Sequence, residues 1–298
     1  MINIIELLKT VLLGIVEGIT EWLPVSSTGH MILLDEFISL EMTDAFKELF
    51  LVVIQLGAII AVPILFWDKL VPSRKKSKEE NKRIIDLWLK VIVGVAPAAL
   101  IGVLVDLVLD DYIGNTFDEI RYVIVAIALV VYGVLFIVIE HVNKNKSPRI
   151  ESVYDLTYRD ALIIGGYQVL SLIPGTSRSG STILGGMLSG VSRTAASEFS
   201  FFMAIPVMLG ASGLKVLKFG LDYIDATDPT LMIPEGQMLA YIIYLLVGCL
   251  VAFLISFFAI KFLMNFVKTH SFASFGVYRI ALGAVVLVYF LIKEFALT

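Results

Sequence analysis

The chain has 298 residues, of which 58% are hydrophobic and 17% are charged, and its mean hydropathy is +0.90. Soluble domains usually carry about 25% charged residues, so this composition excludes an ordinary water-soluble domain. The formal net charge of −4 says little about partners, because the basic residues are concentrated in a few segments. Many apolar residues form blocks that approach the roughly 20 residues a helix needs to cross a bilayer.

The first predicted element is an interrupted apolar stretch at about 4–40, and a similar stretch lies at about 160–190. Glu17, Glu21 and Pro24 interrupt the first stretch, and Pro174 with a run of Gly, Ser, Thr and Arg interrupts the second. Such breaks are tolerated at membrane depth only inside protein or around a wet cavity, so both stretches are predicted to be re-entrant helical hairpins. Six other blocks are predicted to be full transmembrane spans: about 46–67, 85–108, 120–140, 197–219, 237–260 and 273–293.

The loops predict the orientation of these spans. Lys and Arg cluster in segment 69–83, which is therefore expected on the cytoplasmic side. The connections 141–159 and 261–272 also carry basic residues and fit the same side. The loops around 106–119 and 222–228 are acidic and lack Lys and Arg, which fits the outside. Both termini are then external, the first hairpin opens outward and the second opens to the cytoplasm.

The two halves of the chain are predicted to be related. An offset of 150 places Pro24 on Pro174 and Ser27 on Ser177. Each half contains one hairpin and three spans, and because three is odd the second half is inverted. We therefore predict an all-α polytopic membrane protein in which one integral domain, 1–298, contains inverted repeats at 1–145 and 151–298. The broken segments of such repeats meet near the membrane midplane, so the two hairpin turns are expected to share a pocket.

Two glutamates mark the first candidate site. Glu17 and Glu21 are four residues apart and share one helix face. Paired carboxylates in apolar surroundings repel each other and are costly, and a divalent cation relieves both penalties. Mg²⁺ and Ca²⁺ prefer such oxygen ligands, so Glu17 and Glu21 are predicted metal ligands. The alternative places both carboxylates on a wet interfacial surface.

A polar turn follows these glutamates. Pro24 is expected to end the first helix, and residues 26–29 then form a turn whose hydroxyls cap the next helix. His30 is the only histidine near a helix break. A lone histidine is usually structural, but its place after a hydroxyl-rich turn favours a functional role.

The segment 174–182 is the second candidate site. Its small residues allow close approach of a ligand, and the helix that follows aims backbone N–H groups at that ligand. An arginine at membrane depth needs an anionic partner, and the fork of Arg178 matches phosphate oxygens. The structural alternative is a salt bridge from Arg178 to Glu17 or Glu21. The predicted phosphate-binding residues are Ser26, Thr28, Gly175, Thr176, Ser177, Arg178, Ser179, Gly180 and Thr182.

Three motifs carry a family resemblance: Glu17-x-x-x-Glu21, Pro24-Val-Ser-Ser-Thr-Gly-His30 and Pro174-Gly-x-Ser-Arg-Ser-Gly-x-Thr182. They resemble the undecaprenyl-diphosphate phosphatase family of bacteria, also called bacitracin resistance proteins. The resemblance implies an inner-membrane enzyme that removes the terminal phosphate of a C55 isoprenoid diphosphate. The carrier lipid then returns to peptidoglycan synthesis, and bacitracin resistance follows.

The expected partners are this lipid substrate and membrane lipids, with no nucleic acid. The oligomeric state stays open, a homodimer included. The orientation of the repeats predicts a site that opens to the outer, periplasmic face.

The predicted catalytic residues are Glu17, Glu21, Ser27, His30 and Arg178. We predict Ser27 as the nucleophile and His30 as the group that takes its proton; the alternative nucleophile is water activated by the metal. A transporter or flippase for an anionic polyprenyl lipid is the alternative function, because broken helices are typical of transporters. A histidine-nucleophile lipid phosphatase is excluded, since no histidine follows Ser192 and Arg193 within reach.

Overall fold

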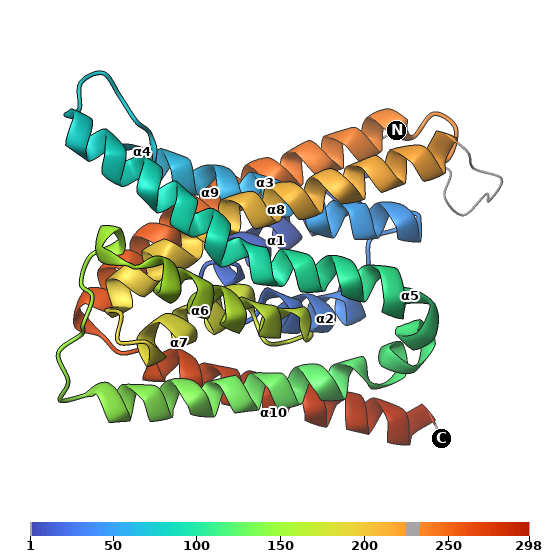
Figure 1. Cartoon of the computed structure of the whole chain (residues 1–298). Coiled ribbons are helices and arrows are strands. Elements are labelled where there is room, and N and C mark those ends of the chain that lie inside the picture. Colours follow the sequence, from blue (N-terminus) through green and yellow to red (C-terminus); the bar gives the residue numbers. More distant parts are fainter. Residues whose placement is uncertain (1, 225–232, 298) are drawn as a thin grey trace.

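The computed structural model describes residues 2–224 and 233–297, with backbone alone at 106–119, 222, 224 and 294–297 (Figure 1). In this part of the chain the regular secondary structure is helical, apart from one isolated bridge between Ile150 and Val191. The helices are α1 Ile4–Thr20, α2 Ser27–Phe37, α3 Asp44–Leu65, α4 Trp67–Leu70, α5 Lys78–Asn143, α6 Tyr158–Val169, α7 Arg178–Leu188, α8 Arg193–Ile224, α9 Met238–Thr269 and α10 Ala273–Leu297. Short 3₁₀ turns, η1 Val153–Asp155 and η2 Leu170–Leu172, flank α6.

Six helical segments are long and apolar enough to cross a membrane, which confirms the predicted number of spans. They are Asp44–Leu65, Lys78–Val105, Ile120–Asn143, Arg193–Leu221, Met238–Thr269 and Ala273–Lys293. The predicted spans at 85–108 and 120–140 lie in one continuous helix, α5, which doubles back on itself (Figure 1). The expected loop between them is therefore helical. The acidic side chains at 106–119 and the acidic segment around Asp225 lie outside the described residues.

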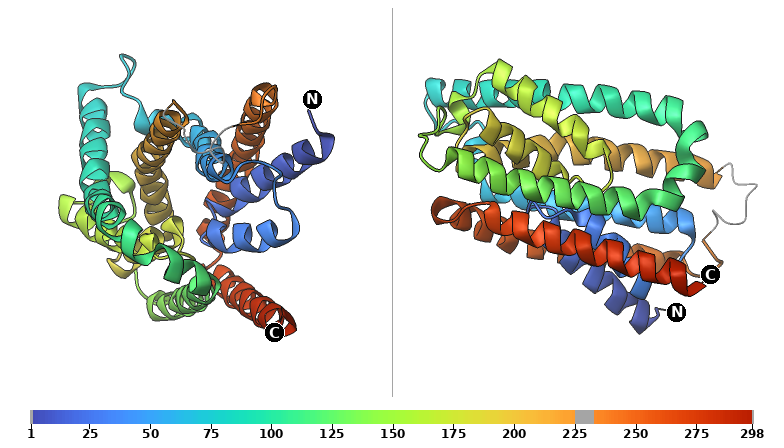
Figure 2. Two further views of the ribbon diagram at one scale, coloured as in Figure 1. Left: turned by 90° about the vertical axis from the view of Figure 1, so that its right-hand side faces the viewer. Right: turned by 90° about the horizontal axis from the view of Figure 1, so that it is seen from below.

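Two helical hairpins lie among the long helices. The first joins α1 to α2, and the second joins α6 to α7 (Figures 1 and 2). α1 packs mainly on α9, and α6 packs mainly on α5. The prediction that Pro24 ends the first helix is wrong, because α1 ends at Thr20 and Pro24 lies inside the turn. Both chain ends lie at one end of the bundle, and the basic segment between α4 and α5 lies at the other (Figure 1).

Small residues permit the closest helix crossings. A Cβ added at Gly57 of α3 would lie 2.1 Å from the carbonyl oxygen of Cys249 on α9. A Cβ added at Gly165 of α6 would lie 2.0 Å from the carbonyl oxygen of Gly94 on α5. Small residues let membrane helices approach closely enough for dispersion forces to hold them. The glycine at 165 thus fixes the second hairpin against α5.

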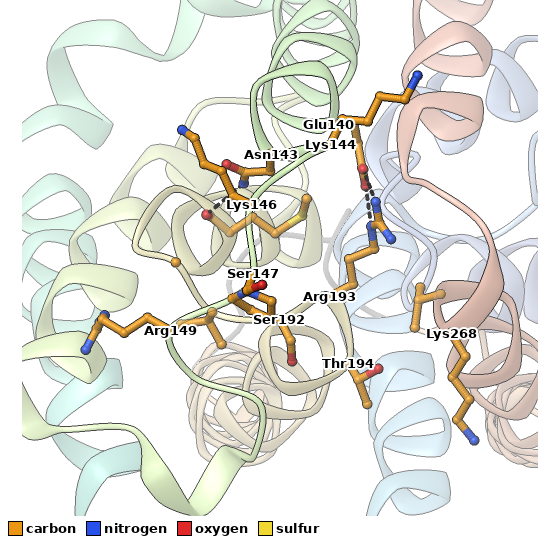
Figure 3. Close-up of a pocket in the computed structure, with 15 residues that line it drawn as sticks. Glu140, Asn143, Lys144, Lys146, Ser147, Arg149, Ser192, Arg193, Thr194 and Lys268 are labelled. Atoms are coloured by element: carbon orange, nitrogen blue, oxygen red, sulfur yellow. Dashed lines mark hydrogen bonds and ion pairs between the residues drawn. The ribbon is translucent and has the colours of Figure 1, made fainter.

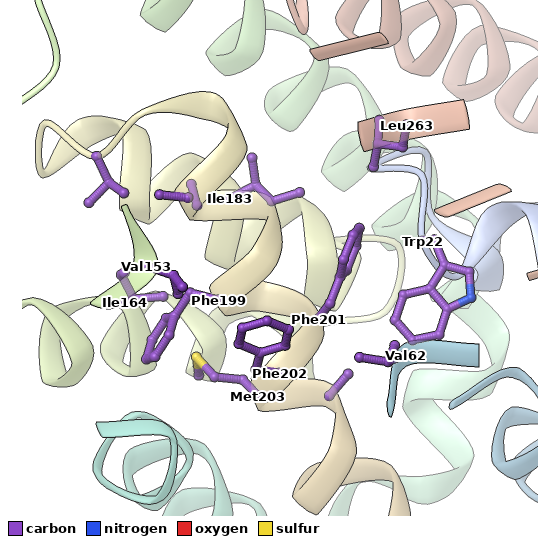
Figure 4. Packing of buried hydrophobic residues seen from close by; sticks show 14 of the residues in the cluster. Trp22, Val62, Val153, Ile164, Ile183, Phe199, Phe201, Phe202, Met203 and Leu263 are labelled. Carbon is purple, nitrogen blue, oxygen red and sulfur yellow. The ribbon is translucent and has the colours of Figure 1, made fainter. Parts of the chain in front are cut away.

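The apolar core connects both hairpins to α8. Trp22, in the first turn, is fully buried and contacts Phe201 edge to face at 5.2 Å between ring centroids. Figure 4 shows this tryptophan beside the aromatic run of α8, which also reaches the second hairpin through Phe199. By contrast, one stripe of α9 exposes large apolar side chains, including Leu246, Leu250 and Phe258. Such an exposed stripe suits contact with lipid chains.

Candidate functional site

The two hairpin turns end in the same kind of helix cap. Ser26 and Ser177 have φ values of 74° and 71°, in the left-handed region that non-glycine residues rarely adopt. Ser26 Oγ accepts the N–H of Gly29 at 3.3 Å, and Ser177 Oγ accepts the N–H of Gly180 at 3.1 Å. Each serine caps a helix of 11 residues, α2 or α7. The two serine caps are therefore equivalent in conformation.

This equivalence corrects the predicted alignment. The caps at positions 26 and 177 are 151 residues apart, so Ser177 matches Ser26 and not Ser27. Ser27 instead matches Arg178, and each is the first residue of its helix. Pro24 matches Gly175 and not Pro174. The shift of one residue matters, because it changes which side chains lie opposite each other.

Glu21 connects the two turns. Ser27 Oγ donates to Glu21 Oε2 at 3.2 Å, and Arg178 Nη2 donates to Glu21 Oε1 at 3.2 Å. Ser179 Oγ also donates to the backbone oxygen of Glu21 at 3.0 Å. The structure therefore brings the two predicted constellations together. It also contains the salt bridge from Arg178 to Glu21 that was the structural alternative.

Arg178 is mostly buried, with 10% of its side chain exposed, and it is incompletely bonded. Its Nη1 donates to the backbone oxygen of Ser200 at 2.8 Å, and its guanidinium carbon lies 5.9 Å from the centroid of the Trp22 ring. Its Nε is buried and has no acceptor among the described residues. A buried donor without a partner is costly, so the fork retains bonding capacity for a ligand.

Glu17 has an unpartnered oxygen beside the site. Its side chain is buried, and its Oε1 has no hydrogen-bond partner among the described residues. A buried carboxylate is tolerated when a cation or a donor compensates it. The orphaned oxygen therefore fits the predicted divalent cation. No group of three or more His, Cys, Asp or Glu side chains in the described part of the chain is arranged to hold a metal, so the predicted pair of Glu17 and Glu21 has no third such residue beside it.

Two neighbouring cavities meet at the first turn. A cavity of about 440 Å³ contains Glu21, Ser27 and Arg178 in its wall. A second cavity, of about 400 Å³, contains Glu17 and Arg121. Ser27, Thr28 and Gln55 line both cavities. The larger one is otherwise mostly apolar, with walls that include Val95, Ala98, Val103, Leu172, Val207 and Leu214. The charged side chains of Glu21 and Arg178 thus lie beside an apolar part of the cavity that suits hydrocarbon.

His30 lies apart from this arrangement. Its Nδ1 contacts the backbone oxygen of Ser26 at 2.7 Å, and its Nε2 contacts the hydroxyl of Tyr278 at 2.6 Å. Because a carbonyl only accepts, Nδ1 carries a hydrogen. His30 lines a third cavity of about 420 Å³, with residues of α1, α9 and α10, and Ser27 is not in the wall of that cavity. Both ring nitrogens therefore have other partners, and the Ser27 hydroxyl donates to Glu21; that His30 takes the Ser27 proton stays a prediction.

The predicted phosphate-binding residues divide into two groups. Thr28, Gly175, Ser177 and Arg178 line the 440 Å³ cavity. The other hydroxyls and Gly180 do not line it, and several of these hydroxyls are bonded inside the protein. For example, Thr182 Oγ1 donates to Ser200 Oγ at 2.6 Å, and Ser26 Oγ caps α2. The structure therefore does not bring Ser26, Thr176, Ser179, Gly180 or Thr182 to the cavity.

Two residues near the site went unrecognised in the sequence. Arg279 of α10 is fully buried, and it donates to carbonyls of both turns. Gln168 of α6 is also buried, and neither amide atom has a partner among the described residues. A signal existed for both, because an arginine or a glutamine inside an apolar span is expensive and usually functional.

Another cavity, of about 470 Å³, lies elsewhere. Glu140, Arg193 and several lysines line it, and Figure 3 shows Arg193 paired with Glu140 at one wall. It contains none of the predicted site residues. Its size alone therefore does not make it the candidate active site.

Comparison with known proteins identifies the family of the chain. The family described as "Bacitracin resistance protein BacA" matches residues 10–285. A protein of Enterococcus faecalis named undecaprenyl-diphosphatase is 52% identical over 289 residues, covering 96% of this chain and 98% of that protein. Another of that name, from Acetivibrio thermocellus, is 52% identical over 288 residues, covering 96% and 98%. The chain belongs to the BacA family of bacitracin resistance proteins.

Proposed function

We propose that this protein hydrolyses undecaprenyl diphosphate to undecaprenyl phosphate and inorganic phosphate in the bacterial inner membrane. This reaction recycles the carrier lipid for peptidoglycan synthesis and underlies bacitracin resistance. Family membership and the names of its relatives support the activity. The observation that carries it is the Glu21 carboxylate, which the Ser27 hydroxyl and the Arg178 guanidinium share at the wall of a mostly apolar cavity.

Ser27 is the proposed nucleophile, and Glu21 is the proposed base. Ser27 Oγ bonds to the terminal phosphorus while its proton passes to Glu21, to which it is already hydrogen-bonded. The bond from that phosphorus to the bridging oxygen breaks, and undecaprenyl phosphate leaves. Water then cleaves the phosphoserine, which releases inorganic phosphate and restores the hydroxyl. Arg178 offsets the charge that develops on the phosphoryl oxygens.

Glu17 and Glu21 are the proposed ligands of a divalent cation, Mg²⁺ or Ca²⁺. The buried and unpartnered Oε1 of Glu17 supports this assignment. Such a cation supplies charge neutralisation beside the phosphates when it is bound. Glu17 lies one helical turn before Glu21. The backbone N–H of Glu21 donates to the backbone oxygen of Glu17 at 3.0 Å. This helical spacing keeps the two carboxylates on one side of α1.

The proposed membrane arrangement has six spans and two re-entrant hairpins in an inverted repeat. The matched caps at Ser26 and Ser177 support the repeat. The site is proposed to open to the outer face. In support, the second cavity contains Glu48, Arg121 and Lys215. These residues lie at the ends of spans opposite the basic segment between α4 and α5, which is the proposed cytoplasmic side.

Phosphate release by the purified protein tests the proposal. Wild-type protein in neutral detergent is expected to release inorganic phosphate from undecaprenyl diphosphate. Glu21→Gln removes the shared charge and is expected to abolish release, whereas Glu140→Gln changes a carboxylate far from the turns and serves as the matched control.

A protein that releases no phosphate but moves the intact lipid across proteoliposomes would contradict the proposal. That result would favour a transporter.

A further inference from the structure

α10 carries an arginine inside a transmembrane span. Arg279 is fully buried; among the described residues Nη1 and Nη2 donate to backbone oxygens, and Nε has no acceptor. Nη1 donates to Pro24 at 3.2 Å, and Nη2 donates to Gly175 at 3.0 Å and to Thr176 at 2.9 Å. One guanidinium thus joins the first hairpin turn to the second.

The joined carbonyls occupy equivalent positions. Pro24 and Gly175 are 151 residues apart, the same offset that relates the two serine caps. Each carbonyl lies three residues before the side chain that reaches Glu21, namely Ser27 in one turn and Arg178 in the other. Arg279 therefore binds each turn at the carbonyl three residues before Ser27 or Arg178.

The surroundings of Arg279 support this role. Its guanidinium carbon lies 5.3 Å from the centroid of the Tyr132 ring, and the Tyr132 hydroxyl accepts from Ser181 of α7 at 3.3 Å. A Cβ added at Gly180 would lie 3.1 Å from Arg279 Nη1, so the guanidinium fits closely against the start of α7. The neighbouring Tyr278 contacts His30 of α2. Two adjacent residues of α10, Tyr278 and Arg279, thus contact the two hairpins.

We propose that Arg279 is a positioning residue of the phosphatase. It sets the spacing of the two turns, so that Ser27 and Arg178 both reach Glu21, and it does not line the cavity that contains them. Lysine cannot replace it, because a single ammonium lacks the planar fork that spans carbonyls of two segments. The inference rests on the proposed function, but the coupling of the two turns can be measured without it.

Arg279→Lys tests the inference, with Arg193→Lys as the matched control. Arg193 also joins separate segments, through Glu140 at the far end of the bundle. For Arg279→Lys we expect kcat to fall about 10- to 100-fold with KM changed less than about threefold, because misplacement by about 1 Å costs up to 10²-fold. Hydrogen exchange is expected to accelerate together in the turns at 21–30 and 173–182. Arg193→Lys is expected to leave both turns and kcat nearly unchanged.

The inference is overturned if exchange accelerates in one turn only, or if kcat falls equally in both variants at equal loss of Tm. If Arg279→Lys does not fold, Tyr132→Leu is used instead, because it removes the ring beneath the guanidinium. Hydrogen exchange must then accelerate in both turns, by less than in Arg279→Lys. Normal exchange in both turns of Tyr132→Leu would overturn the inference. Failure of the wild-type protein to release phosphate refutes the proposed function. The exchange result still decides whether Arg279 couples the turns.

Discussion

Two arginine–glutamate pairs differ in how completely they are bonded. At one end of the bundle, Arg193 contacts both carboxylate oxygens of Glu140, which also accepts the backbone N–H of Phe272 at 2.8 Å (Figure 3). Between the hairpin turns, Arg178 makes one bond to Glu21 at 3.2 Å, and Ser27 shares that carboxylate. The first pair is closed and ties three segments together.

The second pair is open. Nε of Arg178 and Oε1 of Glu17 are buried without partners among the described residues. Unsatisfied buried groups cost stability, so a fold tolerates them where a ligand completes them. This unfilled bonding capacity distinguishes the Arg178–Glu21 pair from the Arg193–Glu140 pair.

The largest expected effect comes from Ser27→Ala. If Ser27 is the nucleophile, its loss removes the attacking oxygen, and the rate of phosphate release is expected to fall about 10³-fold or more. Steady-state turnover in detergent measures this rate. Ser147→Ala, in the cavity that contains Glu140 and Arg193, serves as the control. A variant that retains more than about a tenth of the wild-type rate has lost only about 1.4 kcal/mol of barrier, and this would exclude Ser27 as nucleophile.

Arg178→Lys is expected to lower kcat/KM about 10²–10³-fold, because an ammonium does not reproduce a bidentate fork beside phosphate. Arg193→Lys makes the same chemical change at the closed pair, and we expect it to lower Tm while catalysis stays within about twofold. Near-normal turnover of Arg178→Lys would remove the open pair from the mechanism and end the contrast between the two pairs.

Removal of the proposed cation tests whether Glu17 and Glu21 act as metal ligands. Chelation is expected to abolish activity, and Glu17→Gln is expected to raise the Mg²⁺ or Ca²⁺ concentration for half-maximal rate by at least about tenfold, since it removes a charged oxygen ligand. A titration of cation against rate measures the shift. Full activity in chelator would mean that the carboxylates act as acid–base groups alone.

The smallest effect on activity is expected from a labelling experiment. The proposed orientation puts the Arg193–Glu140 pair at the cytoplasmic end, where Lys75 also lies. On a Cys249→Ala background, a cysteine at position 75 is expected to resist impermeant thiol reagents in intact cells and to react after lysis, with catalysis unchanged. Labelling in intact cells would overturn the proposed orientation and the outward opening of the site.

The sequence by itself determined the six spans, because long apolar runs are a local property that the bilayer selects directly. It also identified both turns, since Gly, Pro and hydroxyl residues interrupt those runs at 24–30 and 174–182. Glu21, Ser27 and Arg178 stood out for the same reason: polar groups at membrane depth need partners.

Only the tertiary structure decided which groups meet. The offset of 151, the contact of His30 with Tyr278 and the bonds of Arg279 to both turns all join residues distant in the chain. Local composition does not encode such pairs, because they depend on how helices pack and on where each backbone carbonyl then points. An alignment by residue identity matched Ser27 with Ser177, whereas backbone conformation matched Ser26, since the cap is defined by φ and by the N–H it accepts.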